Sequence, residues 1–101
     1  MNKAIRDGKV AVLISEGWGF GFYTCGAPIE AIFDPKLVEL IESEDFDGAN
    51  EYVMNTYQGI YTGGVEDLVV VWVDKGEDFI INEYDGSETI QLKNKTEWIT
   101  A

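Results

Sequence analysis

The sequence predicts one α+β domain that spans residues 1–101. Helix-start signals lie in the middle of the chain, and short apolar segments typical of strands lie on both sides of them. Near the C-terminus the dipeptide Asp85-Gly86 separates two such segments, which is a strong signal for a two-residue hairpin turn. The expected order is β-loop-α-α-β-β-β, with a mostly antiparallel sheet, a C-terminal β-meander and two short helices packed on one face.

The first strand is expected over residues 9–14, whose sequence is KVAVLI. It is apolar on both faces, which indicates a central position in a covered sheet. The strand leads into residues 15–24, where glycine alternates with aromatic residues, and Gly26 and Pro28 then mark a loop.

Two short helices are expected next. Asp34 is a good N-cap and Pro35 suits the first helical position. The buried stripe of this helix consists of four apolar residues: Leu37, Val38, Leu40 and Ile41. A second helix is expected to begin near Asp47 and to end before Gly59.

Three strands follow, over residues 67–73, 78–84 and 87–92. The turn between the last two fixes their register, because a two-residue loop leaves one way to pair the flanking residues. Phe79, Ile81, Ile90 and Leu92 then share one face. The same register places Glu83 directly opposite Glu88.

The net charge is −12, from nineteen acidic and seven basic residues. A chain this negative is repelled by nucleic-acid backbones and anionic membranes and is attracted to basic protein surfaces. The alternative is that the charge only keeps the protein in solution. The aromatic content, 13% of residues, predicts a homo-oligomer whose interface includes Trp18 or the glycine-rich segment.

The N-terminus lacks the apolar stretch of a signal peptide, and the longest apolar run, residues 68–73, is too short to cross a bilayer. Cys25 is the only cysteine, so an intramolecular disulfide is impossible. These three features predict a cytoplasmic location.

No catalytic site, metal site or cofactor is expected. The chain has no histidine, which removes the commonest general base and every His-based nucleophile pair or metal site. Cys25 has no neighbouring cation in the sequence and is expected to be a buried, unreactive side chain. Asp45 and Asp47 lack the remaining ligands of a calcium loop.

Gly17, Gly19 and Gly21 alternate with aromatic residues after the first strand, and two interpretations stay open. The glycines permit close packing of this segment against another backbone. Alternatively, the segment binds a nucleotide-like molecule, with Ser15 and Thr24 donating hydrogen bonds. The side chains that would stack on such a ligand are aromatic: Trp18, Phe20, Phe22 and Tyr23.

A second candidate site is the acidic run over residues 39–51. Like charges lie three apart at Glu39 and Glu42, and Glu83 faces Glu88 across the hairpin, so both arrangements are repulsive. A positively charged partner would relieve this repulsion, although a solvated surface is the alternative. The residues expected to bind such a partner are carboxylates: Glu39, Glu42, Asp45, Asp47 and Glu51.

Residues 9–24 (KVAVLISEGWGFGFYT), 33–39 (FDPKLVE) and 61–64 (YTGG) together resemble small uncharacterised proteins carried by bacteriophages. The resemblance covers most of the chain and implies a phage origin and an accessory, non-virion role. In size and charge the chain is also similar to phage inhibitors that mimic nucleic acid, although no motif is shared.

Two functions follow as expectations. The first is a non-catalytic, phage-type accessory protein that masks a basic surface of a host protein and so inhibits a host or defence factor. The alternative is an oligomeric binder that sequesters a nucleotide-like molecule through the glycine and aromatic segment.

Overall fold

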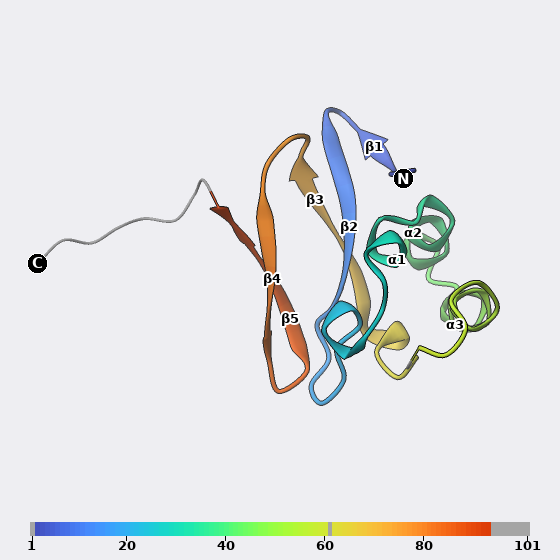
Figure 1. Cartoon of the computed structure of the whole chain (residues 1–101). Coiled ribbons are helices and arrows are strands. Elements are labelled where there is room, and N and C mark those ends of the chain that lie inside the picture. Colours follow the sequence, from blue (N-terminus) through green and yellow to red (C-terminus); the bar gives the residue numbers. More distant parts are fainter. Residues whose placement is uncertain (1, 61, 94–101) are drawn as a thin grey trace, which may run out of the picture.

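The computed structural model describes residues 2–60 and 62–93 and confirms the α+β class. Figure 1 shows three layers: the helices lie along one side of the β1–β2–β3 sheet and the β4–β5 hairpin along the other. In chain order the elements are β1 (Ile5–Arg6), β2 (Lys9–Ser15), η1 (Tyr23–Cys25), α1 (Ile29–Phe33), α2 (Pro35–Glu42), α3 (Phe46–Thr56), η2 (Val65–Asp67), β3 (Leu68–Asp74), β4 (Phe79–Tyr84) and β5 (Ser87–Leu92).

Strand β2 occupies the predicted central position. It pairs antiparallel with β3 along its whole length and with β1 at its first two residues. Residues 10–15 are all buried, because layers cover both faces of the strand. The double burial explains why this segment has no polar alternation.

The predicted N-cap of α2 is present and also joins two helices. One carboxylate oxygen of Asp34 accepts hydrogen bonds from the N–H groups of Lys36 and Leu37, at 2.9 and 3.3 Å. The other oxygen accepts the hydroxyls of Tyr52 and Tyr57, at 2.7 and 2.5 Å. Burial, followed by this hydrogen bond, raises the pKa of each tyrosine above its ordinary value.

Helix α1 was not expected from the sequence. It is a five-residue helix that follows Pro28, and it buries Ala31, Ile32 and Phe33. A helix this short gains little from intrinsic propensity and depends on tertiary packing, so residues 29–33 have no local start or stop signal strong enough to identify it.

The hairpin register is the predicted one, with Phe79 opposite Leu92, Ile81 opposite Ile90 and Glu83 opposite Glu88. The expected meander, however, is divided between two sheets. Strand β3 pairs with β2, whereas β4 pairs only with β5 among the described residues. Four residues separate β3 from β4, and the hairpin leaves the plane of the first sheet and packs against it.

Candidate functional site

The most unusual polar group of the interior is the carboxylate of Glu88 on β5, which is fully buried. One of its oxygens accepts the N–H of Ser15 at 2.8 Å. The other accepts both the N–H and the hydroxyl of Thr24, each at 2.8 Å. Because a carboxylate accepts through both oxygens, it satisfies all three donors at once. Glu88 therefore fastens the segment of residues 15–24 to the hairpin.

Glu88 also completes an unpaired stretch of strand β2. Strand β1 reaches only the first two residues of β2. The N–H of Ala11 points toward the edge of β2 that β1 occupies, since it donates to the backbone oxygen of Ala4 at 2.9 Å. Because N–H groups alternate in direction from residue to residue along a strand, the N–H of Ser15 points to the same edge. Glu88 thus supplies the acceptor that a neighbouring strand would otherwise provide.

The donors that the sequence assigned to a nucleotide-like ligand are therefore used within the chain. The hydroxyl of Ser15 donates to the backbone oxygen of Phe20 at 3.0 Å, and Thr24 donates to Glu88. The N–H of Gly21 donates to the sulfur of Cys25 at 3.2 Å. A phosphate at this position would have to displace an internal carboxylate.

Close packing accounts for Gly21 of the repeat and for Gly86, whose backbone approaches the repeat at Gly19 and Phe20. At Gly86, in the hairpin turn, φ is +86°, and a Cβ would lie 2.3 Å from the nitrogen of Phe20. At Gly21, a Cβ would lie 2.2 Å from the hydroxyl oxygen of Thr24. These contacts favour the packing interpretation of the glycine repeat.

The aromatic residues of this segment do not form one stacking surface. Phe22 is fully buried, so the expectation that it stacks on a ligand is wrong. Trp18 is 66% exposed and contacts Tyr84 of the hairpin edge to face, with ring centroids 5.9 Å apart. Tyr23 instead lines a separate apolar groove, and Phe20 is 45% exposed.

Cys25 is exposed, which corrects the expectation of a buried side chain. It lies in the 3-10 turn η1 rather than in a regular element facing the core. Among the described residues, no three His, Cys, Asp or Glu side chains come together in a way that could hold a metal ion.

The predicted acidic residues are all exposed, but they do not form a single cluster. Glu42 forms two hydrogen bonds with Arg6, at 3.0 and 3.1 Å, and these raise the pKa of Arg6. Asp45 caps α3 by accepting the N–H of Gly48 at 2.9 Å. Asp45 and Asp47 line one surface hollow, and Glu39, Glu42 and Glu51 are not part of its lining.

That hollow begins a groove that the sequence did not predict. Three hollows follow one another and share lining residues: Phe46 and Glu66 link the first to the second, and Glu16 links the second to the third. No described lysine or arginine lines any of them. We call the three together the acidic groove, after its six exposed carboxylates: Glu16, Glu44, Asp45, Asp47, Glu66 and Asp67.

Tertiary structure assembles the acidic groove from three parts of the chain. Asp45 and Asp47 lie at the start of α3, and Glu66 lies in η2. Glu16 follows β2, and its backbone N–H donates to the oxygen of Asp67 at 3.1 Å, which holds the end of β2 beside η2. Like charges from separate elements therefore face the same surface depression.

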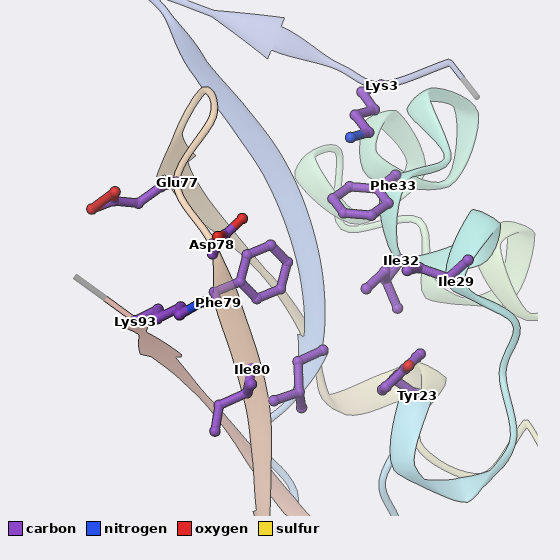
Figure 2. A pocket seen from close by; sticks show the side chains of 11 residues that line it. Lys3, Tyr23, Ile29, Ile32, Phe33, Glu77, Asp78, Phe79, Ile80 and Lys93 are labelled. Carbon is purple, nitrogen blue, oxygen red and sulfur yellow. The ribbon is translucent and has the colours of Figure 1, made fainter. Parts of the chain in front are cut away.

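A second, apolar groove of about 820 Å³ lies between the hairpin and α1. Figure 2 shows Phe79 and Ile80 on the hairpin side across from Ile29 and Ile32 on the helix side. Charged residues of both signs line it as well: Lys3, Lys93, Glu77 and Asp78. The apolar groove therefore carries no net charge.

No protein-family model, curated protein or solved structure matches this chain. Over the described part of the chain, no helix combines the length and the apolar character that crossing a membrane requires.

Sequence reasoning missed the roles of Glu16, Glu66, Asp67 and Glu88. For Glu88 a signal was present, because the hairpin register that turns Ile90 inward also turns Glu88 inward. A carboxylate on a predicted core face requires internal donors. For the other three, no local pattern indicates that they share a groove with the start of α3.

Proposed function

We propose that this protein is a non-catalytic, phage-type accessory protein that binds and covers a basic surface of a host protein in the host cytoplasm, and so inhibits a host or defence factor. The observation that carries the proposal is the acidic groove, where six exposed carboxylates gather and no described cation lines the surface. The phage origin rests on the sequence resemblance alone.

The acidic groove is suited to a partner because no described lysine or arginine lines it to balance its carboxylates. The ion pair between Arg6 and Glu42 lies outside it. Lysine and arginine side chains of a partner would relieve the repulsion between the carboxylates, with a strength that depends on salt. Of the residues predicted from the sequence, this proposal retains Asp45 and Asp47.

The non-catalytic character is supported by the burial and the hydrogen bonds of the Glu88 carboxylate. Glu88 has three internal donors and is fully buried, so it is occupied in holding the fold. The carboxylates of the acidic groove are exposed, and the chain has no histidine to act beside them as a general base.

The alternative, sequestration of a nucleotide-like molecule by residues 15–24, has weaker support. Its hydrogen-bond donors, Ser15 and Thr24, are directed to Glu88 and to Phe20. The apolar groove contains one residue of the predicted ligand set, Tyr23. The homo-oligomer stays a prediction, and a solution mass tests it.

The test compares two charge-reversal variants that change the net charge equally. The first reverses three carboxylates in the acidic groove: Glu44→Lys, Asp47→Lys and Glu66→Lys. The control reverses three exposed carboxylates outside it: Glu30→Lys, Glu39→Lys and Glu51→Lys. The probe is an oligolysine peptide, titrated by calorimetry at two salt concentrations.

The groove variant is expected to bind oligolysine at least about tenfold more weakly than the wild type, since three attractions become repulsions worth about 0.2–1 kcal/mol each. The control is expected to lose less affinity, because only long-range charge changes. Equal losses in the two variants would show that net charge, not the acidic groove, attracts the probe.

A further inference from the structure

The third hollow of the acidic groove is the one of the three that contains an indole ring, because Trp18 lines it together with Glu16. It has a volume of about 530 Å³ and lies between β5 and the β2–β3 sheet. Trp18 and Glu16 line it, together with three aliphatic residues that we call the aliphatic floor: Ile14, Val71 and Ile90. We call it the Trp18 hollow.

The carboxylate of Glu16 is available in this hollow. The side chain is exposed, and no described residue donates a hydrogen bond to it. Its backbone, by contrast, is fixed on both sides: the N–H donates to Asp67 at 3.1 Å, and the oxygen accepts the hydroxyl of Ser87 at 3.0 Å. Glu16 thus has a fixed backbone and a carboxylate to which no donor in residues 2–60 or 62–93 is bonded.

Trp18 is also held in place while remaining accessible. Tyr84 packs edge to face against its ring, at an interplanar angle of 83°. The N–H of the next residue, Gly19, donates to the backbone oxygen of Asp85 in the hairpin turn. The ring is nevertheless 66% exposed. An indole fixed at the edge of an anionic hollow can accept a cation on its face.

We propose that the Trp18 hollow receives an arginine side chain of the partner, an inference that rests on the proposed function for the existence of that partner. The aliphatic floor accommodates the methylene stem, Trp18 stacks on the guanidinium, and Glu16 accepts its hydrogen bonds. Arginine fits this combination better than lysine, because its planar group both stacks and donates in pairs.

Charge complementarity selects a cationic partner over a second copy of the chain. The Trp18 hollow contains no lysine or arginine, and it continues into the rest of the acidic groove. A second copy has a net charge of −12 and would bring further negative charge to this surface. The arginine would therefore act as an anchor at one end of the acidic groove.

The experiment titrates the isotope-labelled full chain with N-acetyl-arginine amide. NMR follows the indole N–H of Trp18 and the backbone N–H groups of Glu16 and of Thr89, which also lines the hollow. N-acetyl-lysine amide is the comparison ligand. The variants are Trp18→Leu, Trp18→Phe and Glu16→Gln. Glu30→Gln serves as the control, since it removes the same charge from α1, outside the hollow.

The expected result is that these signals shift with the arginine ligand and less with lysine. Trp18→Leu and Glu16→Gln should each weaken binding by about two- to fivefold, the size of an exposed cation–π or charged contact. Trp18→Phe should weaken it less than Trp18→Leu, and Glu30→Gln should leave it unchanged.

Three results would overturn the proposal: shifts located elsewhere, equal affinities for arginine and lysine, or shifts of the same signals with protein concentration alone, which would make a second copy the occupant. Because the probe is a single amino-acid derivative, this outcome is separate from that of the proposed function. Oligolysine can bind the acidic groove even if the arginine derivative does not bind the Trp18 hollow, and the arginine derivative can bind even if oligolysine does not.

Discussion

The substitution Glu88→Gln is the sharpest test of how the chain holds residues 15–24 in place. It preserves shape but replaces one carboxylate oxygen with an amide nitrogen that donates. The three groups that face the side chain, from Ser15 and Thr24, are all donors. The hydroxyl of Thr24 can turn away, but one backbone N–H, either the buried one of Ser15 or the partly buried one of Thr24, loses its acceptor.

A buried donor without a partner costs about 1–3 kcal/mol. For a domain of this size each kcal/mol lowers the midpoint of thermal unfolding by about 4–8 °C. We therefore expect Glu88→Gln to lower the midpoint by at least about 4 °C and to reduce the free energy of unfolding in urea by about 1–3 kcal/mol, with an unchanged slope.

The matched control is Glu83→Gln, the cross-strand neighbour of Glu88 on the same hairpin. Glu83 is exposed, and its carboxylate accepts the N–H of Gly86 at 2.7 Å, which a glutamine oxygen can also accept. This variant should change the stability by less than about 0.5 kcal/mol. Equal stability of Glu88→Gln and the wild type would refute the reasoning, as would equal losses in the two variants.

Three further predictions concern packing, pH and assembly. Gly86→Ala should lower the thermal midpoint more than Gly76→Ala, since both have a φ near +87° but a Cβ meets the nitrogen of Phe20 at the first and open space at the second; equal losses would contradict the close approach. The raised pKa of Tyr57 favours its neutral hydroxyl in the folded state. That contribution to stability is therefore complete below the unfolded pKa of about 10 and is lost as the pH rises from there through the raised value. Between pH 8 and 11.5 the urea midpoint should fall less steeply with rising pH in Tyr57→Phe, which has no hydroxyl to donate to Asp34, than in the wild type. The same pH dependence in both proteins would contradict this. Light scattering should give a mass above the 11.3 kDa of one chain, and the monomer mass would disprove the oligomer.

The elements that were predictable from the sequence are those with local signals. The cap at Asp34 and the hairpin register around Asp85 and Gly86 depend on a few neighbouring residues, and both are present. Helix α1 and the division of the strands into two sheets depend on packing between distant segments. The apolar periodicity of residues 67–92 is the same whether the three strands form one sheet or two.

The candidate site shows the same division between local and distant information. The acidic run near Asp45 and Asp47 is visible in the sequence, and both residues line the acidic groove. Glu66 and Glu16 join them only because η2 and the end of β2 meet in the fold. The glycine repeat was also visible, but its packing against Gly86 is a contact between segments more than sixty residues apart.

The most direct test of the proposed function is an NMR map of where oligolysine binds the labelled wild-type chain at low salt. We predict that the largest shifts of backbone N–H signals follow the acidic groove, at Glu44, Asp47, Glu66 and Glu16, and that they disappear at high salt. Shifts spread evenly over all exposed carboxylates, or centred on the apolar groove, would contradict it.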